Sequence, residues 1–168
     1  MQQGIVVTSA NGYVGIGKSI KVLQQGGSPI DAVEQGIRIV ESNIDDHTVG
    51  RAGIPNLLGQ IELDASIMDG STRQAGAVAA LRGFEHPISI ARKVMEHLPH
   101  VLLVDRGAAK FAKEMGFSSR NLMTKETRVR WQRGLDERGE GSEDRSDYFR
   151  LLRSFLSRKD QAKYLGTV

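Results

Sequence analysis

The sequence predicts an α/β sandwich, with a sheet inside and helices outside, from three observations. Apolar residues alternate with polar ones over 61–68, and a period of two is typical of a strand with one buried face. Small residues dominate the return segment 74–81, which fits a central strand that another layer approaches closely. Elements expected before and after this hairpin follow the order strand, helix, helix, then helix, strand, helix, and such alternation indicates layered packing.

The first expected elements are a buried strand over 4–9 and a short helix over 18–25, stopped by Gly26-Gly27. Between them lies the small-residue turn Ala10–Gly12. A strand-to-helix turn is a common place for ligand groups, although a plain connection explains it equally well. The run Gly15-x-Gly17-Lys18-Ser19 lacks the earlier glycine of a phosphate loop at its spacing, so a nucleotide site of that kind is excluded.

Strong signals mark the start of the next helix. Ser28 is a suitable N-cap, Pro29 fits the first turn, and Asp31 matches the positive end of the helix dipole. The small residues Ala32 and Gly36 predict close packing against a neighbouring helix. Its expected apolar face consists of Ile30, Val33, Ile37 and Val40.

A polar loop with several glycines is expected over 43–56. Its Asp45-Asp46-His47 could bind a cation, but three adjacent side chains cannot all point one way, so an exposed loop is the better interpretation. Asp69-Gly70 predicts a tight turn in the hairpin, because both residue types tolerate positive φ. We therefore interpret Asp69 as turn-forming.

After the hairpin, Pro87 and Pro99 bound an expected helix, and the wholly apolar run 101–104 predicts a buried strand. Inward positions of the helix are Ile90, Ala91, Val94 and Met95. A further helix carries Ala108, Phe111, Ala112 and Met115 and is closed by Gly116. His97 and His100 flank a helix end without a carboxylate at ligand spacing, which argues against a metal site there.

From about Ser118 the chain becomes highly charged. A helix containing Val129 and Trp131 is expected, followed by a linker over 138–144 and a narrow apolar stripe formed by Tyr148, Leu151, Leu152 and Phe155. We therefore predict three parts: a core over 1–119, a charged helical tail and linker over 120–166, and a final piece over 167–168.

Composition narrows the function classes. The 168 residues suffice for one domain with a sizeable core, and the absence of cysteine excludes disulfides and Cys-based metal sites. Net charge is +3, with −1 over 1–119 and +4 over 120–168, but acids interleave the bases of the second part, so nucleic-acid binding is not favoured. No apolar run approaches the roughly 20 residues of a membrane span, and no signal peptide is recognisable. We expect a cytoplasmic protein without membrane contact.

Several blocks of the sequence resemble the α-subunit of the glycosylasparaginase, plant-type L-asparaginase and isoaspartyl peptidase family. The resemblance rests on Gly50–Asn56, Glu62–Gly70, Ala75–Ala79, Ala91–Val104, Gly107–Ala112, Gly116-Phe117 and the Arg130-Trp131 region. It covers nearly the whole chain. It implies an αββα four-layer sandwich of the N-terminal nucleophile (Ntn) hydrolase type, here its α-subunit half, made from a precursor that cleaves itself.

The resemblance also implies the nucleophile. In the asparaginase branch, the new N-terminal threonine lies in a Gly-Thr-Val-Gly context, which Gly166-Thr167-Val168 matches. Cleavage is then expected between Gly166 and Thr167. A freed α-amino group has a pKa near ~8 and can act as the base for the Thr167 hydroxyl. Gly166 lacks a Cβ, so the strained backbone needed for self-attack is less hindered.

The substrate stays open among L-asparagine, isoaspartyl peptides and glycosylasparagine. The glycosylasparaginase branch typically has Asp before its threonine and an aromatic residue near the end of the first strand, whereas this chain has Gly166 and Ala10–Gly12. Asn11 is a candidate substrate-binding residue. No cofactor is expected, although the resemblance leaves open a structural monovalent cation at the loop 43–56.

The resemblance implies specific partners. The arginine and aspartate that bind substrate, and the oxyanion-hole residues, belong to the family's β-subunit. We therefore expect the chain to act only with its own β-subunit, as a dimer of αβ units. A non-catalytic fragment or binding module that keeps the Ntn fold is the alternative. Cleavage at Gly166-Thr167 would favour the enzyme, and a stable uncleaved chain would favour the module.

Overall fold

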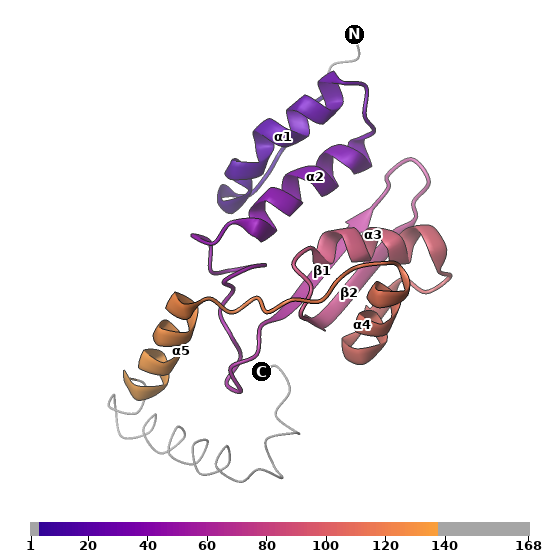
Figure 1. Ribbon diagram of the computed structural model, residues 1–168. Helices are drawn as coiled ribbons and strands as arrows, with labels where there is room; N and C mark the ends of the chain where they lie inside the picture. The colour runs from indigo at the N-terminus through magenta and orange to yellow at the C-terminus, as the bar shows by residue number, and fades with distance from the viewer. Residues whose placement is uncertain (1–3, 138–168) are drawn as a thin grey trace, which may run out of the picture.

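The computed structural model describes residues 4–137, with the side chains of 135–137 left aside (Figure 1). The helices are a 3₁₀ turn η1 (Ala10–Gly12), α1 (Tyr13–Gln24), α2 (Pro29–Ser42), α3 (Pro87–His97), α4 (Asp105–Glu114) and α5 (Lys125–Glu137). The strands are β1 (Glu62–Met68), β2 (Ala75–Arg82) and β3 (Leu102–Val104). The predicted linker over 138–144, the stripe over 148–155, Gly166 and Thr167 all lie outside the described residues.

The central hairpin is confirmed. β1 pairs antiparallel with β2, β2 pairs parallel with β3, and the order in the sheet is β1-β2-β3. The turn is longer than the expected Asp69-Gly70 dipeptide, because the Asp69 N–H donates to Gln74 O at 2.9 Å and so encloses six residues. Asp69 is turn-forming as predicted. Its carboxylate accepts hydrogen bonds from the N–H and the hydroxyl of Ser71, at 2.8 and 2.7 Å.

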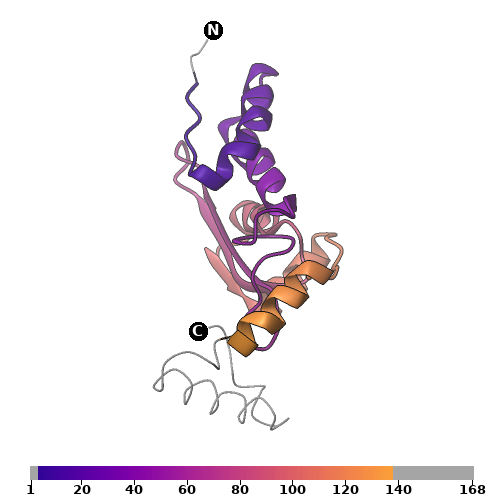
Figure 2. The same cartoon turned by 90° about the vertical axis from the view of Figure 1, so that its left-hand side faces the viewer.

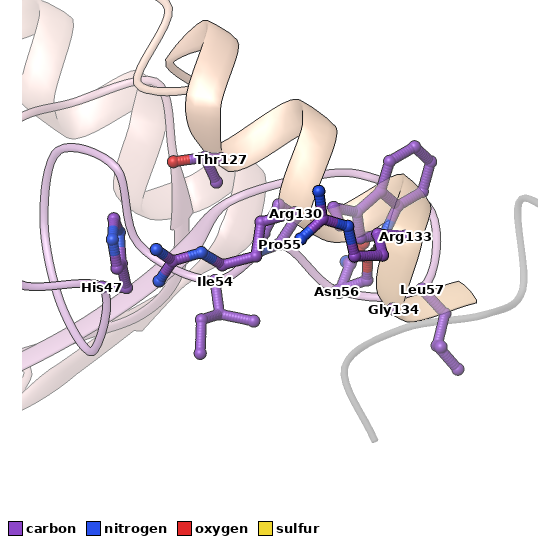
Figure 3. Close-up of a pocket in the computed structure, with 10 residues that line it drawn as sticks. His47, Ile54, Pro55, Asn56, Leu57, Thr127, Arg130, Arg133 and Gly134 are labelled. Atoms are coloured by element: carbon purple, nitrogen blue, oxygen red, sulfur yellow. Dashed lines mark hydrogen bonds between the residues drawn. The ribbon is translucent and has the colours of Figure 1, made fainter. Parts of the chain in front are cut away.

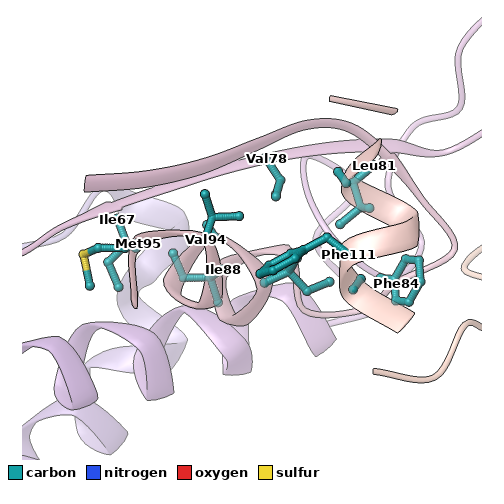
Figure 4. Close-up of a cluster of buried hydrophobic side chains, with 12 residues drawn as sticks. Ile67, Val78, Leu81, Phe84, Ile88, Val94, Met95 and Phe111 are labelled. Atoms are coloured by element: carbon teal, nitrogen blue, oxygen red, sulfur yellow. The ribbon is translucent and has the colours of Figure 1, made fainter. Parts of the chain in front are cut away.

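The small residues of β2 allow a helix to lie directly on the strand. A Cβ on Gly76 would clash with the Ala91 carbonyl oxygen and the Met95 N–H of α3. Apolar side chains of the sheet, α3 and α4 form one buried cluster on this face (Figure 4), which includes Ile67, Val78, Leu81, Phe84, Ile88, Val94, Met95 and Phe111. The predicted close approach to β2 is therefore confirmed.

The other face of the sheet corrects a prediction. Leu102 and Val104 are half exposed, at 50% and 51%, so the run 101–104 is not fully buried as expected. In this short strand only Leu103 points toward the core cluster, since neighbouring side chains alternate between the faces. Both α3 and α4 pack on the same face as Leu103, and Figure 2 shows no described helix over the opposite one.

The N-terminal segment corrects a second prediction. Residues 4–9 form no strand among the described residues, and Ile5 is 88% exposed. A strand needs a hydrogen-bonded neighbour, and the described sheet provides none for this segment. Figure 2 shows it running beside η1 and α1 instead.

Helix α1 begins at Tyr13, five residues before the expected start. Gly15 and Gly17 weaken the helical signal of this stretch, but Gly15 packs against Gly36 of α2, and this contact favours the helix. The α2 start is confirmed as a capping box, in which Ser28 and Asp31 bond each other's backbone N–H groups. Val33 is 45% exposed and does not join the predicted apolar face.

The segment that follows α4 packs against residues near the start of β1. The Ala52 N–H donates to Leu122 O at 3.0 Å, and Leu122 packs with Ile61 and Leu63 in a second small cluster. Helix α5 follows, as predicted around Trp131, and stands apart from the sheet in Figure 1. Every helix within 4–137 is too short or too polar to span a lipid bilayer.

Candidate functional site

Asn11 is the one predicted site residue that the structure places. It lies on η1, directly before α1, and its side chain is exposed. The turn is tight, because the Gly12 N–H donates to Ser9 O at 3.0 Å and a Cβ on Gly12 would clash with the Thr8 hydroxyl. Asn11 is therefore presented at a fixed position at the surface.

The loop 43–56 supplies the partner of Asn11. The Asn11 Nδ2 donates to the Thr48 hydroxyl at 3.1 Å, and that hydroxyl donates to Asp46 Oδ1 at 2.6 Å. The Thr48 N–H donates to the same oxygen at 2.8 Å. These bonds, led by the Thr48 hydroxyl, hold the pKa of Asp46 below its usual value. The result is a polar patch of an anchored amide beside an ionised carboxylate.

A cavity of about 430 Å³ lies between the loop 43–56 and α5, and we call it the loop–α5 pocket (Figure 3). Its lining is formed by His47, Ile54, Pro55, Asn56, Leu57, Thr127, Arg130, Trp131, Arg133 and Gly134. The Trp131 indole N–H donates to Asn56 O at 3.0 Å, and the Thr127 hydroxyl donates to Ala52 O at 3.3 Å. Sequence reasoning missed this pocket, although a lone tryptophan in a basic helix was a usable signal.

The side chains of the loop 43–56 do not gather into a metal-binding group, and a structural monovalent cation at this loop stays a prediction. Over residues 4–137 no group of three or more His, Cys, Asp or Glu side chains could hold a metal ion. The loop carbonyls of His47, Ala52 and Asn56 already accept hydrogen bonds from Ile54 N, Thr127 Oγ1 and Trp131 Nε1. His47 itself is held by a 2.9 Å hydrogen bond between its Nδ1 and Ala52 O.

Comparison with known proteins identifies the family. A family model described as asparaginase matches residues 6–168. The chain belongs to this asparaginase family. The α/β arrangement, with its small sheet and covering helices, is consistent with the Ntn-hydrolase fold of the family, as the sequence predicts.

Individual relatives from three differently named groups are similar to the chain. An N(4)-(β-N-acetylglucosaminyl)-L-asparaginase of Elizabethkingia miricola is 45% identical over 68% of this chain and 34% of its own length. A plant-type L-asparaginase of Pyrococcus abyssi is 48% identical over 63% and 34%. An isoaspartyl peptidase/L-asparaginase of Danio rerio is 39% identical over 68% and 38%. The aligned region thus covers roughly a third of each of these asparaginase-family relatives.

Proposed function

We propose that the chain is the α-subunit of an autoprocessing threonine hydrolase that cleaves β-aspartyl amide bonds. The observation that carries this proposal is the asparaginase family match, which runs to residue 168 and so includes Gly166 and Thr167. Relatives are named for asparagine, isoaspartyl peptides and glycosylasparagine, and each of these compounds carries an amide at the β-carboxyl group of an aspartyl unit. The expected division into a core over 1–119, a tail over 120–166 and a start of the β-subunit at 167 stays a prediction.

The proposed maturation uses Thr167 against its own backbone. The Thr167 hydroxyl oxygen attacks the Gly166 carbonyl carbon, and the peptide C–N bond breaks as the C–O bond of an ester forms. The hydroxyl proton passes to the departing nitrogen, which becomes the amine. Water then hydrolyses this ester, which frees the Gly166 carboxylate and leaves Thr167 with an α-amino group. A mid-chain threonine hydroxyl is a weak nucleophile, so this step needs support from surrounding groups of the full-length protein.

The mature chemistry follows from the freed amine. The α-amino group, with a pKa near ~8, accepts the proton of the Thr167 hydroxyl while the oxygen attacks the substrate's side-chain amide carbon. The same proton passes to the leaving nitrogen, which departs as ammonia or an amine. Water then hydrolyses the acyl-enzyme ester to release aspartate or an aspartyl product. Thr167 thus supplies both nucleophile and base, and we propose that no cofactor takes part.

We propose that a β-subunit completes the molecule. The half-exposed Leu102 and Val104, together with Ala77 and Ala79 in register beside them, form a sheet face that no described helix covers. A second sheet packed on this face would bury these residues and give the four layers of the αββα sandwich. A dimer of αβ units and a cytoplasmic location stay predictions.

Asn11 is proposed as a substrate-binding residue on the α-subunit side. Its surface position and its anchoring to Thr48 support a polar contact with substrate. We expect Asn11→Ala to raise KM more than it lowers kcat, because it removes a hydrogen bond made to the bound ground state as well as to the transition state.

Substrate assays on the full-length protein test the proposal. Ammonia release is measured with L-asparagine and aspartate release with a β-aspartyl dipeptide, each with and without Thr167→Ala. Release of N-acetylglucosaminylamine is followed with glycosylasparagine. The chain has similar sequence identity to relatives named for each of these substrates. The assay therefore decides which substrate is used. Turnover of none of the three by a cleaved, folded protein would favour the alternative, a non-catalytic member that keeps the fold for binding.

A further inference from the structure

The loop–α5 pocket has walls that are held in place from two distant parts of the chain. Trp131 of α5 is fixed by its indole hydrogen bond to Asn56 O, 3.0 Å long. The Asn56 side chain in turn accepts hydrogen bonds from Leu58 N and Gln60 N, at 2.9 and 3.0 Å. The Trp131 ring also lies within about 3 Å of the position that a Gly59 Cβ would take. The pocket is therefore preformed, which is typical of small-molecule sites.

The lining combines an apolar surface with positive charge. Pro55, Leu57 and the Trp131 ring provide apolar surface, and Ile54 beside them is 69% exposed. Arg130 and Arg133 reach into the same space from α5, and Figure 3 shows His47 facing them from the loop. The residues that line the pocket include these two arginines and no acidic residue. The pocket therefore has an apolar wall with positively charged side chains beside it.

Among the side chains that the structure describes, the Glu126 carboxylate lies near these arginines and is weakly held. Glu126 contacts Arg130 Nη2 at 3.2 Å, and both side chains are more than half exposed. Exposed pairs four residues apart on a helix contribute little. A ligand carboxylate that bonds Arg130 and Arg133 together can therefore replace Glu126, and charge-assisted bonds of this kind are among the stronger polar contacts.

We propose that the loop–α5 pocket binds a small organic anion, with its carboxylate at Arg130 and Arg133 and its apolar body against Trp131. The volume of about 430 Å³ lies in the range of small-molecule sites. This inference does not rest on the proposed hydrolase chemistry. It concerns residues that have no role in the proposed amide cleavage. The binding experiments below therefore test it independently of the proposed role of Thr167.

Phenylacetate is a suitable probe, because it joins a carboxylate to an apolar ring. Trp131 lines the pocket, so the part of the fluorescence change that a Trp131→Phe variant abolishes reports on the pocket, and calorimetry gives the affinity. We expect saturable binding of phenylacetate, and binding at least about tenfold weaker for uncharged phenylacetamide and for inorganic phosphate, each of which satisfies only one half of the site.

Matched variants identify the residues responsible. Arg130→Gln and Arg133→Gln should each weaken phenylacetate binding about fivefold to tenfold. Arg128→Gln removes the same charge from the same helix outside the pocket lining and should leave the affinity unchanged. The substituted side chains are exposed, and circular dichroism verifies that each variant is folded. Absence of saturable binding, equal binding of phenylacetamide, or equal loss with Arg128→Gln would overturn the proposal.

Discussion

Gly15 of α1 and Gly36 of α2 lie backbone against backbone. A Cβ on Gly15 would clash with the Gly36 carbonyl oxygen, and a Cβ on Gly36 would lie 3.3 Å from the Gly15 carbonyl oxygen and clash with the Ser19 hydroxyl. The Ser19 hydroxyl also donates to Ala32 O of α2 at 2.7 Å. These contacts set the spacing of the two helices, and so fix the position of Asn11, in η1 directly before α1, relative to α2.

Gly15→Ala should destabilise the protein. The added methyl group has no space, so α1 and α2 must move apart, and overpacking of this kind costs about 1–3 kcal/mol. Urea unfolding followed by circular dichroism measures the change. Gly17→Ala is the matched control two residues away, where a Cβ would meet nothing within 4 Å. It should be neutral or stabilise by up to about 1 kcal/mol, and equal losses for the two variants would contradict the account.

Glu41 makes the stability depend on pH. Its carboxylate is 1% exposed, and it accepts a hydrogen bond from Ile88 N at 3.0 Å near the start of α3. Burial raises the pKa of Glu41 above its ordinary value of 4.5, against opposing contributions that begin with His86. A raised folded-state pKa means that the native state binds the proton more tightly. Stability from this group is therefore full below pH 4.5 and declines as the pH rises through the folded-state pKa.

Glu41→Gln should flatten this decline. The amide oxygen can still accept the Ile88 hydrogen bond but does not titrate near neutral pH. Urea unfolding of both proteins at a series of pH values from about 4 to 8 measures the difference. The wild-type protein should lose more stability than the variant as the pH rises. Parallel curves for the two proteins would show that the buried carboxylate does not titrate as argued.

Arg92 of α3 joins three carboxylates. Its Nη1 lies 2.7 Å from both Asp31 Oδ1 and Glu34 Oε2 of α2, and its Nε lies 2.6 Å from Glu96 Oε1. Glu34 is mostly buried and also accepts a hydrogen bond from Ser89, at 2.5 Å. Loss of the guanidinium would leave the Glu34 carboxylate largely desolvated beside one hydroxyl donor.

Arg92→Met should therefore cost about 1.5–3 kcal/mol, the range for hydrogen bonds to charged groups. The thermal midpoint should fall accordingly in differential scanning calorimetry. Lys110→Met is the control, since Lys110 pairs with Glu114 at 3.9 Å on an exposed surface, and such pairs contribute about 0.5 kcal/mol or less. If the control lost as much stability as Arg92→Met, the bridge between α2 and α3 would have no special role.

Local chemistry accounts for the parts of the fold that the sequence predicts well. The alternation 61–68, the cap Ser28 and the small residues around Gly76 each act through neighbours in sequence or through steric size, which a single sequence displays. The exposure of Leu102 depends on whether another element packs on its face of the sheet. The absence of a strand over 4–9 depends on whether a neighbouring strand is there to pair with it. Both are properties of tertiary structure, which a local sequence pattern does not contain. The apolar run 101–104 therefore predicted burial, although the described fold leaves one face of this strand uncovered.

The candidate sites divide in the same way. Asn11 is predicted as a substrate-binding residue in the turn after an apolar segment, and this role stays a prediction. Its partner Thr48 lies 37 residues away, and only the folded chain brings the two together. Arg130 and Trp131 belong to a helix that reads as a solvated charged face, and the loop 43–56 converts one side of it into a pocket. Thr167 was identified through family resemblance and lies outside the described residues.

Intact-mass analysis of the full-length gene product tests the central claim most directly. The proposal predicts that the wild-type protein separates into two chains, with the second beginning at Thr167, and that it then releases ammonia or an amine from a β-aspartyl substrate. Thr167→Ala should remain one uncleaved chain and turn over no substrate. A Thr167→Ala protein that still cleaves before residue 167 and retains full activity would contradict the account.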